Sequence, residues 1–189
     1  MVNLANALTM FRIVLVPVFV VALFIDDGRS DLWRVIAFVV FAVAAITDQI
    51  DGRIARGWNL VTDFGKMADP IADKALIGAA LLGLSILGDL AWWVTVVILV
   101  REIGVTLLRF WVIRHGVIPA SRGGKLKTLL QCIGIGMFVL PLNGVLHVVG
   151  WVFMIAAVIA TVLTGLDYIW QAMSLRRTAH AAATDAKFR

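Results

Sequence analysis

Long apolar stretches alternate with short polar connections along the whole chain. The apolar stretches cover residues 8–25, 32–50, 69–88, 90–113, 126–142 and 146–172. A helix that crosses a bilayer needs about 20 mostly apolar residues, and each stretch is close to that length. The pattern predicts an all-α membrane protein with six transmembrane helices. It also predicts a short interfacial helix over NLANALTM (residues 3–10), before the first span.

Composition supports the membrane interpretation. The chain has 189 residues, of which 61% are hydrophobic, and its mean hydropathy is +0.96. Soluble domains are about 45–50% apolar. We expect one membrane domain over residues 1–175 and a polar, loosely ordered cytosolic tail over 176–189. The net charge is +5, but in a membrane protein the location of charge matters more than its sum, and we expect no nucleic-acid partner.

Basic residues are concentrated on one set of connections. Among the alternate connections only Arg29 is basic. Because lysine and arginine favour cytoplasmic loops, both termini and the aspartate-rich connection are predicted to face the cytoplasm, with the chain in the cytoplasmic membrane. The residues of the basic set are, in chain order, Arg53, Arg56, Lys66, Arg114, Arg122, Lys125, Lys127, Arg176, Arg177, Lys187 and Arg189.

Four aspartates lie where the second apolar stretch ends and the third begins. Asp48 and Asp51 are three residues apart, and Asp69 and Asp73 are four apart, so each pair shares one face of its helix. The short connection makes the two helices antiparallel neighbours, which allows the pairs to face each other. Four carboxylates in a low-dielectric pocket repel one another, and a divalent cation removes that conflict. Oxygen ligands suit magnesium, manganese or calcium rather than zinc.

One of these aspartates also has a structural explanation. Asp69 precedes Pro70, which is typical of a helix N-cap followed by proline at the first helical position, and both roles are compatible. Asp63 lies outside the pattern and is expected to be a solvated loop residue or a cap. The other three have no comparable structural role, and acidic residues at a membrane edge are functional by default.

Small residues and an arginine accompany the aspartates. Gly52 leaves backbone room beside the carboxylates, Ala55 lies one turn further on, and Gly65 allows a ligand or a helix to approach closely. Arg56 is placed to reach an anionic group with its two-pronged guanidinium.

Together these residues resemble the signature of the CDP-alcohol phosphatidyltransferases. The match is Asp48-x2-Asp51-Gly52-x2-Ala55-Arg56-x8-Gly65-x3-Asp69-x3-Asp73, with all eight positions at the family's spacing. Members of that family have six transmembrane helices, with this motif at the cytosolic ends of the second and third. The resemblance therefore extends over nearly the whole chain.

The resemblance implies a set of roles. The four aspartates would hold two divalent cations, Mg2+ or Mn2+, that grip the pyrophosphate of CDP-diacylglycerol. Asp73 would also be the general base that takes the proton from the acceptor hydroxyl, whose oxygen attacks the phosphorus carrying the lipid while CMP leaves. A homodimer in the lipid bilayer is implied as well. The residues that would help to form the nucleotide pocket are Gly52, Ala55, Arg56 and Gly65.

Charged residues in the fourth and fifth apolar stretches bear on the acceptor. Arg101-Glu102-Ile103, Arg109 and Gly124-Lys125-Leu126-Lys127-Thr128 are similar to the pattern of the phosphatidylglycerophosphate synthases. This similarity implies sn-glycerol 3-phosphate as the acceptor, with its phosphate bound by Arg109, Lys125 and Lys127. Two positions depart from the pattern, namely Phe110, where many members have an acid, and Ala5, where many have proline.

Several alternatives stay open from the sequence. Within the family, one alternative acceptor is an inositol phosphate. Another is phosphatidylglycerol, which would make the protein a cardiolipin synthase. For Lys125 and Lys127, the alternative is that they contribute only to the excess of basic residues on the cytoplasmic side. For Arg101 and Glu102, the alternative is a purely structural ion pair. Outside the family's chemistry, the chain is a divalent-cation transporter that uses the four aspartates, or a catalytically inactive scaffold.

Overall fold

The protein is all-helical. The computed structural model describes the backbone of residues 4–57, 63–112 and 122–187, and the side chains of 7–47, 74–108, 124–171 and 173–174. Within this part of the chain there is no strand, which confirms the predicted all-α class. The elements are α1 (Leu4–Phe24), the short 3-10 helix η1 (Ile25–Gly28), α2 (Asp31–Gly57), α3 (Asp63–Ile86), α4 (Trp92–Val112), α5 (Arg122–Val139) and α6 (Val145–Lys187).

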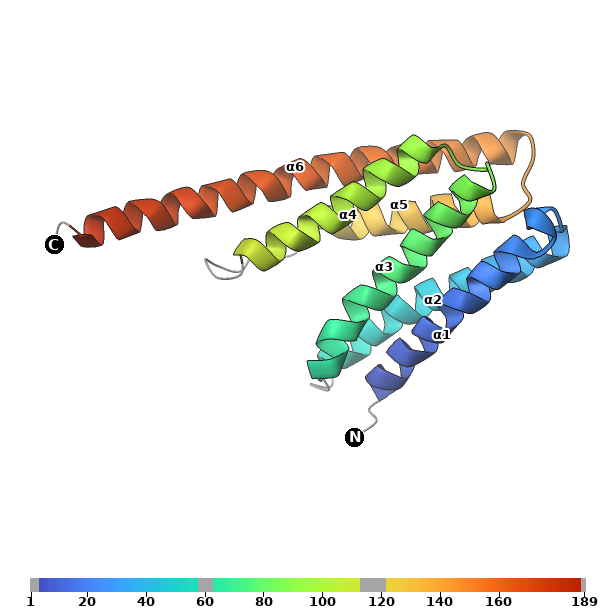
Figure 1. The fold of residues 1–189 in the computed structure, drawn as a ribbon, viewed down its shortest axis with the longest axis horizontal. Helices are drawn as coiled ribbons and strands as arrows, with labels where there is room; N and C mark the ends of the chain where they lie inside the picture. The colour runs from blue at the N-terminus through green and yellow to red at the C-terminus, as the bar shows by residue number, and fades with distance from the viewer. Residues whose placement is uncertain (1–3, 58–62, 113–121, 188–189) are drawn as a thin grey trace.

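The six α-helices alternate in direction. The first residues of α1, α3 and α5 and the last residues of α2, α4 and α6 lie toward one end of the bundle, on the left in Figure 1. We call this the motif end, because α2 and α3 carry the aspartate signature there. Helix α1 packs against α2 and α3, while α6 packs against α4 and α5. Both ends of the described chain therefore lie at the motif end.

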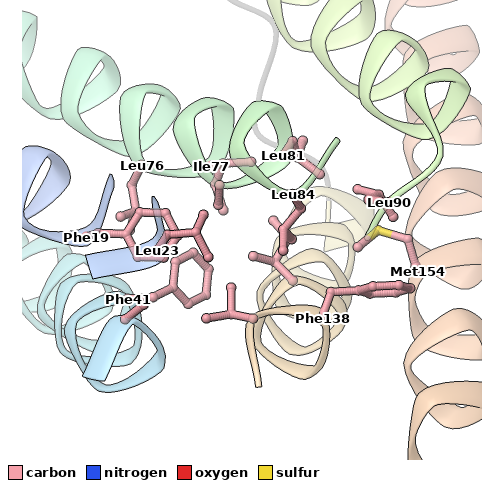
Figure 2. Packing of buried hydrophobic residues seen from close by; sticks show 14 of the residues in the cluster. Phe19, Leu23, Phe41, Leu76, Ile77, Leu81, Leu84, Leu90, Phe138 and Met154 are labelled. Carbon is pink, nitrogen blue, oxygen red and sulfur yellow. The ribbon is translucent and has the colours of Figure 1, made fainter. Parts of the chain in front are cut away.

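Large apolar side chains from all six α-helices form one buried cluster at the centre of the bundle, and Figure 2 shows part of it. Phe19 of α1 and Phe41 of α2 are in contact, with ring centroids 5.7 Å apart. Leu81 of α3 and Met154 of α6 are completely buried. Glycine allows α5 and α6 to approach closely, because a Cβ added to Gly134 would lie 3.3 Å from the Cα and N atoms of Met154.

Two predictions about the chain's ends are wrong. The expected interfacial helix is not separate, since residues 4–10 form the first turns of a continuous α1. Thr9 and Arg12 are buried inside the bundle, so the beginning of α1 packs against its neighbours as part of the same helix. The expected loose order of the tail fails over residues 176–187, where α6 continues to Lys187. This segment is rich in alanine, the best helix former.

Two segments of the described chain are long and apolar enough to cross a membrane. They are Ala7–Gly28 and Val145–Gln171, with mean hydropathies of 2.6 and 2.4. Each predicted span overlaps one of the six helices. The six-span topology itself stays a prediction.

The end opposite the motif end is closed by a tight turn after α1. Asp26, Asp27 and Gly28 have φ angles of 55°, 52° and 70°, which is the left-handed region. Glycine adopts this region freely, and aspartate is among the few other residues that tolerate it. The sequence Asp-Asp-Gly thus reverses the chain between α1 and α2.

Arg34 joins four parts of the fold at the same end. Its Nε donates to the carbonyl oxygen of Gly28 at 2.8 Å, and its Nη1 donates to the carbonyl oxygen of Phe138 at 3.3 Å. Its Nη2 forms an ion pair with Asp89, in the turn between α3 and α4. One buried guanidinium therefore joins α2 to η1, to the end of α5 and to the α3–α4 turn.

Candidate active site

The residues of the aspartate signature lie on two helices that contact each other. The α2 part carries Asp48, Asp51, Gly52, Ala55 and Arg56, and the α3 part carries Gly65, Asp69 and Asp73. Helices α2 and α3 contact one another. Helix α2 runs toward the motif end, and α3 runs away from it (Figure 1). The side chains of all eight residues lie outside the described ones, so their metal-binding and nucleotide-binding roles stay predictions.

The donor set of the signature suits a hard divalent cation. Between residues 48 and 73 the chain has neither histidine nor cysteine, and its acidic residues supply only oxygen ligands. Elsewhere, among the side chains that the structure describes, no group of three or more His, Cys, Asp or Glu residues is arranged to hold a metal ion.

Next to the signature, a partly buried ion-pair network connects α4 to α5. The Nζ of Lys127 and the Nη1 of Arg101 both contact the same carboxylate oxygen, Oε1 of Glu102, the latter at 3.1 Å. The side chains of Lys127, Arg101 and Glu102 are only 5%, 13% and 19% exposed. Removing one partner of an ion pair that is so sheltered from water is destabilising, because it leaves the other charge without compensation.

Arg101 is held in place by α6. Its Nη2 donates to Oγ1 of Thr164 at 2.8 Å, and its guanidinium carbon lies 5.9 Å from the ring centre of Tyr168. A Cβ added to Gly165 would lie 3.1 Å from Cγ of Arg101, so the glycine makes room for the arginine stem. Hydrogen bonding and a cation–π contact together fix the orientation of the guanidinium.

A second connection joins this network to the signature helix α3. Lys74, the residue after Asp73, contacts the hydroxyl of Thr106 on α4 through its Nζ. The same hydroxyl donates to the backbone carbonyl of Glu102 at 2.7 Å. The position next to the predicted base is thereby coupled to the turn of α4 that carries Glu102.

The residues predicted to bind the acceptor phosphate differ in their surroundings. Lys127 is buried and paired with Glu102, whereas Lys125 is exposed on the first turns of α5. Arg109 lies on α4, and its side chain is outside the described residues. The Arg101–Glu102 contact that the sequence left open as a structural pair is present.

Sequence reasoning missed four members of this network, namely Lys74, Thr106, Thr164 and Tyr168. One local signal was available, since Thr106 lies four residues after Glu102 and so shares its helix face. Thr164 and Tyr168 are likewise four apart on α6, but nothing in the sequence indicates that they face Arg101.

A pocket of about 430 Å³ lies at the opposite end of the bundle, beside Arg34 and Asp89. None of the predicted site residues lines it. It is therefore separate from the candidate active site.

The chain belongs to the CDP-alcohol phosphatidyltransferase family, whose model matches residues 2–163. The predicted family membership, and with it the prediction of a phosphatidyl-transferring enzyme, is confirmed. The chain is 58% identical over 181 residues to the "probable phosphatidylglycerophosphate synthase" of Mycobacterium tuberculosis strain H37Rv, covering 94% of this chain and 87% of that protein.

Relatives from other bacteria carry a related name. The chain is 39% identical to the CDP-diacylglycerol–glycerol-3-phosphate 3-phosphatidyltransferase of Rickettsia felis, over 88% of this chain and 93% of that protein. It is 37% identical to the protein of the same name from Bacillus subtilis, over 92% of this chain and 98% of that protein.

Proposed function

We propose that the protein transfers the phosphatidyl group of CDP-diacylglycerol to sn-glycerol 3-phosphate, forming phosphatidylglycerophosphate and CMP. The observation that supports this acceptor most strongly is the 58% identity, over most of both chains, to a protein named as a probable phosphatidylglycerophosphate synthase. The complete signature on α2 and α3 supports the chemistry.

Asp48, Asp51, Asp69 and Asp73 are the residues that would hold two divalent cations, Mg2+ or Mn2+. Cations bound there would neutralise charge on the phosphoryl oxygens and stabilise the leaving group. Four carboxylates on two contacting helices are a suitable ligand set, because oxygen donors are what these ions prefer.

Asp73 is the general base in the proposed reaction. It takes the proton from the acceptor hydroxyl, whose oxygen forms a bond to the phosphorus that carries diacylglycerol. The bond from that phosphorus to the oxygen of CMP breaks, and CMP leaves with the electron pair. Gly52, Ala55, Arg56 and Gly65 form the nucleotide pocket, with Arg56 binding an anionic group of the nucleotide.

A positive cluster next to the signature supports an anionic acceptor. Among its described members, three cations (Lys74, Arg101 and Lys127) accompany one carboxylate, that of Glu102. This excess of positive charge in a partly dehydrated site favours a phosphate group. Lys127 binds the acceptor phosphate in the proposed complex, together with Lys125 and Arg109.

We place the protein in the cytoplasmic membrane with six transmembrane helices. Apolar side chains that face outward support this, including Val21 on α1, Val39 on α2, Val100 on α4 and Leu163 on α6. Only 28% and 22% of the most apolar parts of Ala7–Gly28 and Val145–Gln171 are buried inside the bundle. Apolar faces that point outward in this way suit contact with lipid. The charge bias places the motif end and both termini on the cytoplasmic side. The homodimer rests on the family resemblance alone.

Membership of this family favours an enzyme over a cation transporter or an inactive scaffold. An experiment distinguishes sn-glycerol 3-phosphate from the other two acceptors, an inositol phosphate and phosphatidylglycerol. Purified protein is given CDP-diacylglycerol, Mg2+ and one acceptor at a time, and release of CMP is measured. The proposal predicts fastest release with sn-glycerol 3-phosphate and a phosphatidylglycerophosphate product. Faster release with inositol phosphate or phosphatidylglycerol would overturn the acceptor assignment.

A further inference from the structure

Glu102 lies at the centre of the partly buried network, between two cations from different helices. Its Oε1 atom contacts Arg101, its neighbour on α4, and Lys127 on α5. Twenty-five sequence positions separate Glu102 from Lys127, and the contact forms where α4 and α5 both pack against α6. The proposed function uses Lys127 but assigns Glu102 no role.

The support of Glu102 begins on α6. Thr164 and Tyr168 fix the Arg101 guanidinium, and Arg101 in turn holds the Glu102 carboxylate at 3.1 Å. Glu102 then contacts the Nζ of Lys127. The contacts thus form a relay from α6 through α4 to Lys127 on α5.

We propose that Glu102 is a positioning residue that, anchored by Arg101, holds the Lys127 ammonium where it binds the phosphate of a phosphomonoester acceptor. This inference rests on the proposed function, because it concerns the acceptor site of the same reaction. Glu102 itself touches neither substrate.

The electrostatics of the network are consistent with such a role. A lysine side chain is flexible, and holding it in one orientation costs conformational entropy unless a partner fixes it. An ammonium group carries three donor hydrogens, so it binds a carboxylate and a phosphate oxygen at the same time. Because Arg101 also pairs with Glu102, the three side chains of Arg101, Glu102 and Lys127 keep one net positive charge for the incoming anion.

The decisive variant is Glu102→Gln, which keeps the size of the side chain and removes its charge. We expect the KM for sn-glycerol 3-phosphate to rise about tenfold, the size of one weakened charge-assisted hydrogen bond. The kcat and the KM for CDP-diacylglycerol should stay within about twofold. Glu102→Asp, which keeps the charge on a shorter side chain, should restore part of the loss.

Asp167→Asn is the matched control. It makes the same change in charge, but Asp167 is exposed on α6 and pairs with Gln171 at 2.8 Å. Its kinetics should equal those of the unmodified protein.

A double-variant cycle tests whether Glu102 acts through Lys127. If it does, Glu102→Gln should add little to the KM increase that Lys127→Gln causes alone. Multiplication of the two effects would overturn the proposal. So would an unchanged acceptor KM in Glu102→Gln, or an equal loss for both substrates accompanied by lower thermal stability.

Thr164→Val keeps the test valid if Glu102→Gln fails to fold. It removes the hydroxyl that anchors Arg101, and the relay predicts a smaller KM increase in the same direction, about threefold. No increase in this variant would overturn the relay. The unmodified protein separates the two proposals. If it does not use sn-glycerol 3-phosphate, the proposed function fails. If it does and the variants leave the acceptor KM unchanged, only the positioning role fails.

Discussion

Arg34 in the first turns of α2 forms an ion pair with Asp89 in the turn between α3 and α4, while it also donates to two backbone carbonyls. The Arg34 side chain is 10% exposed. Replacing Arg34 by Met leaves Asp89 and both carbonyls without this partner, and should lower the free energy of unfolding by about 1–3 kcal/mol. Thermal unfolding in detergent measures the loss. Arg29→Met, at an exposed position beside the same pocket, is the control and should change stability little.

Asp73→Asn tests the assignment of the base. The amide cannot accept the proton of the acceptor hydroxyl, so CMP release should fall by about 10²–10⁴-fold. The variant should still elute as the same species in size-exclusion chromatography. Asp63→Asn, at the first residue of α3 and outside the signature, serves as the control and should retain full activity. Substantial turnover in Asp73→Asn would refute the base assignment.

Chelation tests the metal requirement. Treatment with EDTA should stop CMP release, and added Mg2+ or Mn2+ should restore it, because the ligand set consists of carboxylates. Zn2+ should restore it poorly. Asp69→Asn should need a higher Mg2+ concentration for half-maximal activity. Full activity after exhaustive chelation would exclude the proposed use of divalent cations.

Arg109→Ala tests how the acceptor is recognised. If this guanidinium binds the phosphate of the acceptor, its loss should raise the KM for sn-glycerol 3-phosphate by about tenfold or more. The KM for CDP-diacylglycerol should change little. Arg176→Ala is the control, since Arg176 is expected only to contribute to the cytoplasmic charge bias. An unchanged acceptor KM would favour an acceptor without a phosphomonoester.

Alanine substitutions at two glycines should change the stability of the protein in opposite directions. A Cβ at Gly134 would press on the backbone of Met154 at 3.3 Å, whereas a Cβ at Gly104 would meet nothing within 4 Å. Gly134→Ala should therefore destabilise the protein by about 1–3 kcal/mol. Gly104→Ala, in the interior of α4, should stabilise it by about 0.5–1 kcal/mol. Unfolding curves recorded in one detergent compare the two, and equal shifts would contradict the close packing of α5 and α6.

Hydropathy predicted the positions of the helices well, because each long apolar run overlaps one helix. It failed where a helical segment is not apolar. Residues 176–187 are polar yet helical, since alanine favours the helix without any need for burial in lipid.

The candidate site was predictable in its chemistry and much less so in its contacts. The aspartate signature is a local pattern, and spacing alone places each pair of carboxylates on one helix face. The pair Glu102–Lys127 joins residues 25 positions apart, and Arg34–Asp89 joins residues 55 apart. Such pairs depend on how whole helices pack against one another, which no local spacing encodes.

Helix α6 extends well past its neighbours in Figure 1. Its apolar segment ends at Gln171, and the helix continues to Lys187, which adds roughly 24 Å at the rise of an α-helix. A fluorophore or spin label near Lys187 would thus stand clear of the bundle. Quenching from either side of a vesicle would then report which way the protein is inserted, without disturbing the residues proposed to bind substrate.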